Sequence, residues 1–150
     1  MDIRLGRDMI MLPVTLITAS ILGILYVFLS IAVSGERGKS KIGLGTGAEA
    51  TAVLGQEHAA SKLLIAVRRH GHFAEYVPIS LILLALLELA NTGRNVLIGL
   101  AVALVVARLM ITMGMGRPAP NVLRAGGNVV QLLMILTACC FGLLAAVTNW

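Results

Sequence analysis

The chain is poor in the residues that keep a soluble protein in water. Only 13% of its 150 residues are charged and 4% are aromatic, whereas 58% are hydrophobic. A soluble domain is usually about 25% charged, so this composition excludes an ordinary water-soluble domain. It also excludes intrinsic disorder, because disordered chains are hydrophilic and strongly charged. The composition indicates an integral membrane protein.

Cysteine and histidine are too few, and wrongly spaced, for a disulfide framework or a metal centre. The two cysteines, Cys139 and Cys140, are adjacent inside an apolar run. Of the three histidines, His70 and His72 diverge on a helix and lack the spacing of a two-histidine metal face. We therefore predict no metal site.

The excess of basic residues does not indicate a nucleic-acid partner. Twelve Lys and Arg stand against seven Asp and Glu, which gives a net charge of +5. These residues lie between apolar runs, where basic side chains normally mark the cytoplasmic side of a membrane. We expect contact with membrane lipid and no nucleic acid.

Long apolar runs predict an all-α fold with four membrane-spanning helices. A spanning helix needs about 20 mostly apolar residues. The spans are expected at about residues 9–33, 57–89, 96–115 and 122–147. A polar break over residues 34–41 ends the first span, and the second is long enough to project partly from the bilayer. A signal peptide fits the first span poorly, because its apolar run exceeds the usual length of about 7–15 residues.

The connections between the spans predict the orientation. The first and third connections share one side and are basic, with Arg37, Lys39, Lys41 and Arg117. The opposite side has three arginines, two of them offset by acids: Arg4, Arg7 and Arg94 against Asp2 and Asp8. By the positive-inside rule, both termini face away from the cytoplasm.

The densest polar cluster of the chain lies at residues 68–78, inside the second span. At about 100° per residue, Arg68, His72 and Glu75 fall within one stripe of a helix. A charged side chain within the bilayer costs about 2.5–3.5 kcal/mol, so such residues mark candidate sites. Arg108 and Arg124 lie in other spans near the same side. Together they suit an anionic ligand that also carries one ammonium group.

An alternative interpretation makes this stripe part of the membrane interface. Its arginines then extend toward lipid headgroups, and Arg68 and Glu75 neutralise each other. The interpretation leaves Arg108 and Arg124 without an explanation.

Residues 68–78 read Arg-Arg-His-Gly-His-Phe-Ala-Glu-Tyr-Val-Pro. This segment resembles the second-helix signature of the MAPEG superfamily, the membrane-associated proteins in eicosanoid and glutathione metabolism, and its bacterial branch in particular. The resemblance extends over the length, the four spans, Ala107-Arg108-Leu109 and the arginine that opens the fourth span. It implies one MAPEG-like transmembrane domain over residues 1–150: a left-handed four-helix bundle, assembled as a homotrimer in the bacterial inner membrane.

The resemblance also implies a binding site for glutathione, the co-substrate, between neighbouring subunits. Carried over by position, Arg124 lies beside the glutathione sulfur and is the candidate catalytic residue. Arg68 binds a carboxylate and Glu75 the ammonium group. The full set of implied glutathione contacts is Arg68, His72, Glu75, Tyr76, Arg108, Arg37 and Asn128. Gly35 competes with Arg37 for the position in the first span.

Four positions depart from the family pattern. His72 replaces the usual Asn, Ile111 replaces a His found in many members, and Met115 replaces a Tyr found in some. Asn128 stands where the prostaglandin-synthase members have Tyr. Glutathione binding is therefore better supported by the resemblance than any particular chemistry, and eicosanoid synthesis is in doubt.

Three functions remain open from the sequence. The resemblance implies a glutathione transferase, or a peroxidase, that acts on lipophilic electrophiles through a thiolate stabilised by Arg124. Only about 3% of a free thiol is ionised at pH 7, so the thiolate needs such help. The second function is a small proton-coupled exporter that uses Glu75. The third is a catalytically silent member of the superfamily.

Overall fold

The computed structural model describes residues 11–45, 57–117 and 120–148, with the side chains of the second stretch described from Lys62 onward. These residues form four helices and no strand: α1 (Pro13–Ser40), α3 (Glu57–Leu89), α4 (Arg94–Gly114) and α5 (Val122–Thr148). Each helix is long and apolar enough to cross a membrane. The prediction of an all-α membrane protein with four spans is confirmed.

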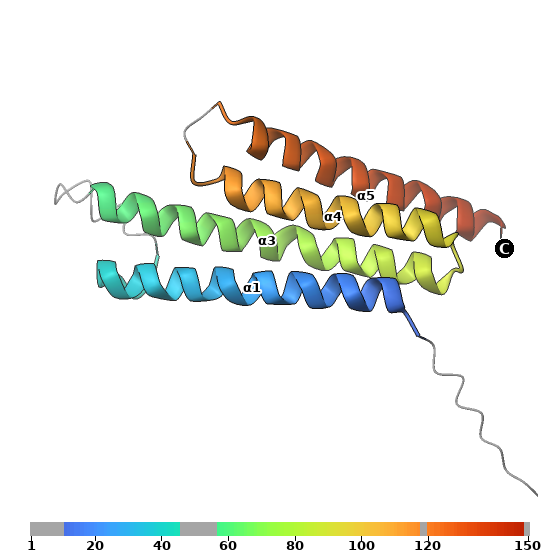
Figure 1. Cartoon of the computed structure of the whole chain (residues 1–150), viewed down its shortest axis with the longest axis horizontal. Coiled ribbons are helices and arrows are strands. Elements are labelled where there is room, and N and C mark those ends of the chain that lie inside the picture. Colours follow the sequence, from blue (N-terminus) through green and yellow to red (C-terminus); the bar gives the residue numbers. More distant parts are fainter. Residues whose placement is uncertain (1–10, 46–56, 118–119, 149–150) are drawn as a thin grey trace, which may run out of the picture.

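The four helices lie side by side, with α1 and α5 at opposite edges of the bundle and α3 and α4 between them (Figure 1). The closest packing joins α4 to α5 and α1 to α3. The end of α1, the start of α3 and the α4–α5 connection lie at one end of the bundle, which we call the basic end. The α3–α4 turn and the end of α5 lie at the other end, the far end.

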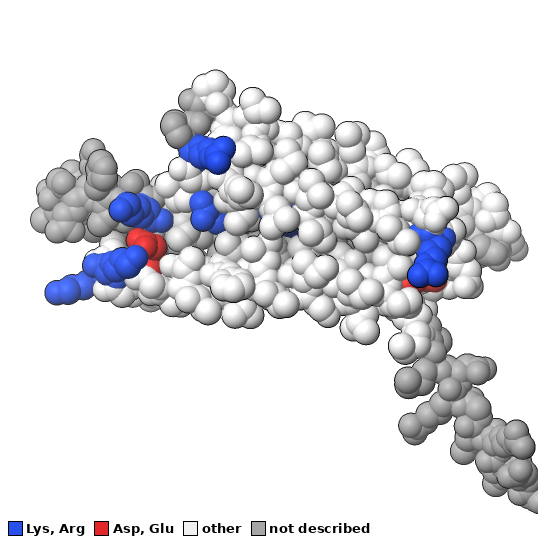
Figure 2. Space-filling model, in the orientation of Figure 1, with Lys and Arg blue, Asp and Glu red and all other residues white. Residues whose placement is uncertain are grey.

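Charged side chains gather at the two ends of the bundle, and the visible surface between them is almost free of charge (Figure 2). The described cations of the basic end are Arg37, Lys39, Lys41, Lys62, Arg68, Arg69, Arg117 and Arg124. The far end holds Arg94 and Glu88. An uncharged band between charged ends is the surface expected of a protein that spans a bilayer.

The core is a layer of leucine and other apolar side chains between the helices. Leu22 of α1, Leu84 of α3 and Leu104 of α4 are at most 1% exposed. By contrast, α1 leaves Leu16, Ile17 and Phe28 largely uncovered. Such exposed apolar faces are stable only against lipid or another protein chain.

The first helix continues through the polar segment that was predicted to end the first span. Residues 34–40 are helical, and the helix stops only at Lys41, whose φ of 56° is left-handed. Lys39 forms an ion pair of 2.7 Å with Glu36, and Ser40 Oγ donates to the carbonyl of Glu36. The helix therefore extends beyond the residues that were predicted to span the membrane, because polar side chains can end a span without ending a helix.

The N-terminus of α1 is capped by a carboxylate from α3. Glu88 accepts hydrogen bonds from the backbone N–H groups of Val14 (2.9 Å) and Thr15 (2.8 Å). Leu12, which precedes the helix, supplies no side-chain cap. Pro13 suits the first helical position because it has no N–H to satisfy. Glu88 thus satisfies two free backbone donors and ties α1 to α3. Residues 9 and 10, where the span was expected to start, lie outside the described residues.

We predict that Glu88→Ala lowers the free energy of unfolding by about 1.5–3 kcal/mol, because two charge-assisted hydrogen bonds at a helix N-terminus are lost. Thermal or denaturant unfolding in detergent measures the change. Glu36→Ala is the matched control, since it removes a carboxylate from an ion pair at the surface and is expected to cost less than about 1 kcal/mol. Equal losses in the two variants would contradict a capping role.

Candidate functional site

A polar groove of about 740 Å³ opens at the basic end, between α3, the residue that follows α4, and the start of α5. Its walls combine apolar and charged side chains: Leu64, Ile65, Val67, Arg68, Gly71, His72, Glu75, Met115 and Arg124. Arg68, His72 and Glu75 follow one another along α3 at spacings of four and three. They line one groove, as this helical spacing predicts.

The charges of the polar groove are not paired with one another. Arg68, Glu75 and Arg124 are exposed at its surface within the single chain. In residues 11–45, 62–117 and 120–148, the one ion pair joins Lys39 to Glu36, and none joins Arg68 to Glu75. The interpretation in which Arg68 and Glu75 neutralise each other is therefore not supported. Two guanidinium groups and one carboxylate face the groove with their charges available.

Arg124 is fixed in position by a close junction between α4 and α5. A Cβ atom at Gly114 would lie 2.6 Å from the backbone nitrogen of Arg124, so only glycine permits this approach. Asn121 Nδ2 donates to the carbonyl of Gly114 (2.8 Å). Its Oδ1 accepts from the backbone N–H groups of Leu123 (3.0 Å) and Arg124 (3.4 Å), which is a helix N-cap. Asn121 was not predicted from the sequence, although an Asn just before an apolar helical run is a recognisable capping signal.

His72 is held by two of the other predicted site residues. Arg108 Nη1 lies 3.2 Å from His72 Nδ1 and also donates to the His72 carbonyl. A guanidinium only donates, so Nδ1 is the acceptor and the neutral ring carries its proton on Nε2. The ring stacks on Tyr76, with centroids 4.7 Å apart. Tyr76 and Arg108 thus contact His72, and neither they nor Asn128 are among the residues that line the groove.

Arg108 is the residue of this group that most needs hydrogen-bond partners, because it carries a charge and is only 1% exposed. Its Nε donates to Gln131 Oε1 (2.9 Å), and Gln131 Nε2 donates to Ser80 Oγ (2.8 Å). Ser80 Oγ in turn donates to the carbonyl of Tyr76. A buried charge is tolerated only when hydrogen bonds replace its water shell. Gln131 and Ser80 were not predicted as site residues from the sequence, although a glutamine inside the apolar run 122–147 is a recognisable signal of a buried polar contact.

The structure does not bring Arg37 to the polar groove. Its Nη1 donates to the carbonyl of Gly43 (2.8 Å), in the segment that follows α1. His70 also lies away from the groove, as the sequence predicted. Its Nε2 is 3.1 Å from Ser30 Oγ, and its ring packs against Tyr26.

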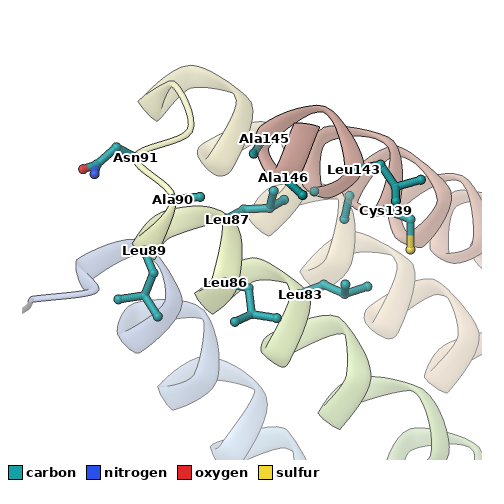
Figure 3. A pocket seen from close by; sticks show the side chains of 12 residues that line it. Leu83, Leu86, Leu87, Leu89, Ala90, Asn91, Cys139, Leu143, Ala145 and Ala146 are labelled. Atoms are coloured by element: carbon teal, nitrogen blue, oxygen red, sulfur yellow. The ribbon is translucent and has the colours of Figure 1, made fainter. Parts of the chain in front are cut away.

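A second cavity, of about 890 Å³, lies at the far end, between α3 and α5 (Figure 3). Leu83 and Leu87 of α3 and Cys139 and Leu143 of α5 are among its walls. No charged side chain lines it, and Asn91 is its one amide. It lacks the ionic groups of the polar groove and lies at the opposite end of the bundle, so it does not extend that site.

Four membrane-spanning helices with an ionic groove at one end define an integral membrane protein. The model of the MAPEG family matches residues 15–145, which is nearly the whole chain. The protein belongs to this family and is therefore a multi-pass membrane protein related to glutathione metabolism. No match is found among curated proteins, and none among solved structures.

We predict that Gln131→Leu lowers the free energy of unfolding by about 2–3 kcal/mol, because it leaves the buried Nε of Arg108 without an acceptor. Unfolding in detergent measures the loss. The double variant Arg108→Met with Gln131→Leu is expected to be more stable than Gln131→Leu alone, since the buried charge and its unmet donor disappear together. A single variant as stable as the unmodified protein would show that Gln131 does not support Arg108.

Proposed function

We propose that the protein is a glutathione transferase that joins glutathione to lipophilic electrophiles and binds glutathione in the polar groove. One observation carries the proposal: Arg68, Glu75 and Arg124 line a single groove of about 740 Å³ without an ion pair between Arg68 and Glu75. Glutathione has two carboxylates, one ammonium group and one thiol. Its ionic groups complement the charges that line the groove.

The proposed binding mode assigns one chemical task to each charged residue. Arg68 binds a carboxylate of glutathione, because a guanidinium can donate two parallel hydrogen bonds to it. Glu75 binds the ammonium group. The groove volume lies in the range of about 300–1,000 Å³ that is usual for small-molecule sites. His72 forms part of the wall, and Tyr76 and Arg108 support binding by fixing its ring.

In the proposed mechanism, Arg124 stabilises the thiolate of bound glutathione. An adjacent positive charge can lower the pKa of a thiol by about 1–3 units from its usual value near 8.5. The thiol proton passes to solvent at the basic end. The thiolate sulfur then attacks an electrophilic carbon of the second substrate, forms a C–S bond and displaces a leaving group such as chloride. An apolar electrophile reaches the site through the lipid, which explains why the enzyme is a membrane protein.

The proposal includes a homotrimer, with the groove covered by a neighbouring copy. Within one chain, Arg68, Glu75 and Arg124 are exposed on a surface that would otherwise meet lipid. Ionised side chains in a membrane protein usually face protein or water. Arg37 would contact glutathione only from such a neighbour, since it does not line the groove of its own chain. We also propose that the basic end faces the cytoplasm of a bacterial inner membrane, with both termini on the other side.

The exporter hypothesis is less well supported by the same groove. Glu75 shares it with Arg68 and Arg124. Two guanidinium groups would repel a lipophilic cation from the groove, which opposes its export. Proton-driven uptake into vesicles that is abolished by Glu75→Gln would favour the exporter over the transferase.

We predict that Arg124→Ala lowers the rate of conjugation of glutathione to a chlorinated aromatic electrophile by about 10-fold or more at pH 7, because the thiolate loses its stabilising charge. The rate of the variant should recover partly as the pH rises, since solution pH then ionises the thiol. Conjugation by the purified protein in detergent is measured, and calorimetry measures glutathione binding beside it.

Arg117→Ala is the matched control for this experiment. Arg117 is an exposed arginine at the same end of the bundle, and it does not line the polar groove. Its removal should leave the conjugation rate unchanged. If Arg124→Ala conjugates as fast as the unmodified protein, the assignment of Arg124 is wrong. Binding of glutathione without turnover in the unmodified protein would identify a catalytically silent member of the family.

A further inference from the structure

A second ionic cavity lies at the basic end, beside the polar groove. This basic pocket has a volume of about 390 Å³ and lies between α1 and α3, next to the α4–α5 connection. Its walls are Ala32, Gly35, Glu36, Lys39, Lys62, Ile65, Ala66, Arg69 and Gly116. Ile65 is the one residue that it shares with the polar groove, so none of the charges that would bind glutathione belongs to it.

The basic pocket carries an uncompensated positive charge. Glu36 is its one acid and is paired with Lys39 at 2.7 Å. Lys62 and Arg69 lie seven residues apart on α3, and therefore on the same face, two helical turns from each other. No carboxylate among the residues with described side chains forms an ion pair with either of them. Two cations in the pocket thus remain available to an anion.

Arg69 is half-buried at the wall of the basic pocket, and one of its N–H donors has no acceptor. Its side chain is half-buried, and its Nη2 lies so close to Gly116 that a Cβ atom there would be only 2.9 Å away. Its Nε is buried and has no hydrogen-bond partner. Arg69 thereby contributes a half-buried cation to the wall of the basic pocket.

On α1, the wall of the basic pocket is apolar toward the middle of the bundle, where Ala32 lies about one helical turn before Glu36. On α3, Ile65 and Ala66 lie between Lys62 and Arg69. Phe28 precedes Ala32 by one helical turn on α1 and is 66% exposed. Ile21, one further heptad back on the same face of α1, is 47% exposed. Exposed apolar side chains therefore follow α1 from Ile21 to Phe28, toward the cations at its basic end.

We propose that the basic pocket binds the phosphate group of an anionic phospholipid. Lys62 and Arg69 neutralise the phosphate, and the acyl chains lie along the exposed apolar face of α1. Basic pockets between membrane helices are suited to anionic lipid headgroups. Free phosphate is also an anion, but it has no acyl chains that could lie against the apolar surface. This inference does not depend on the proposed glutathione chemistry.

Binding is measured by native mass spectrometry of the purified protein, titrated with phosphatidylglycerol and, in parallel, with phosphatidylcholine. The unmodified protein should bind phosphatidylglycerol at least 5-fold more tightly than phosphatidylcholine. The double variant Lys62→Gln with Arg69→Gln should lose this preference. Arg117→Gln is the matched control, because it removes an exposed charge from the same end without touching the pocket, and it should keep the preference.

Three results would overturn the proposal. The first is an equal affinity of the unmodified protein for the two lipids. The second is a preference that survives in the double variant or is lost in Arg117→Gln. The third is displacement of the lipid by inorganic phosphate at a similar concentration, which would identify a site for free anions. Lys62→Gln alone, which removes an exposed side chain, provides the same readout if the double variant is unstable.

Calorimetry with glutathione separates this proposal from the previous one. The double variant should bind glutathione as the unmodified protein does, because neither Lys62 nor Arg69 lines the polar groove. Conversely, Arg68→Gln should weaken glutathione binding and leave the lipid preference intact. Loss of both properties in the double variant would contradict the separation of the two sites.

Discussion

The polar half of this protein is organised around one buried guanidinium. Arg108 lies inside a bundle that spans a membrane, so it cannot regain its hydration from the surroundings. Its Nε donates instead to Gln131, and its Nη1 contacts the ring and carbonyl of His72, whereas its Nη2 is buried without a partner. These bonds set the orientation of the His72 ring, and the ring forms part of the polar groove. The hydrogen bonds of a buried guanidinium in the core thereby orient one side chain in the wall of a surface site.

The sequence was sufficient to predict the helices and the main polar stripe. Apolar runs of the required length predict membrane spans by composition alone, and α3 occupies the residues expected of it, Glu57–Leu89. The stripe of Arg68, His72 and Glu75 follows from the rotation per residue of an α-helix, which is a local property. The family signature at residues 68–78 lies in the same helix, and the family match extends over residues 15–145.

The contacts between helices could not be predicted, because they depend on how the helices pack. Glu88 looks like an ordinary solvated carboxylate at a helix end, yet it caps α1 across a separation of more than 70 residues. Gln131 gains its role only from the position of Arg108 on the neighbouring helix. Arg37 is the opposite case. The resemblance implies a contact with glutathione, whereas in the structure Arg37 Nη1 donates to the carbonyl of Gly43 in the same chain.

The structure divides the cations that line cavities at the basic end into two sets. Arg68 and Arg124 face the polar groove with Glu75, whereas Lys62 and Arg69 face the basic pocket beside α1. Ile65 lines both cavities and lies between the two sets. A ligand that carries an ammonium group gains from Glu75 and fits the first set. A phosphate group with acyl chains gains from the apolar face of α1 and fits the second. Under the two proposals, the single carboxylate in the groove and the apolar surface beside the pocket would direct two different anions to separate sites at one end of the bundle.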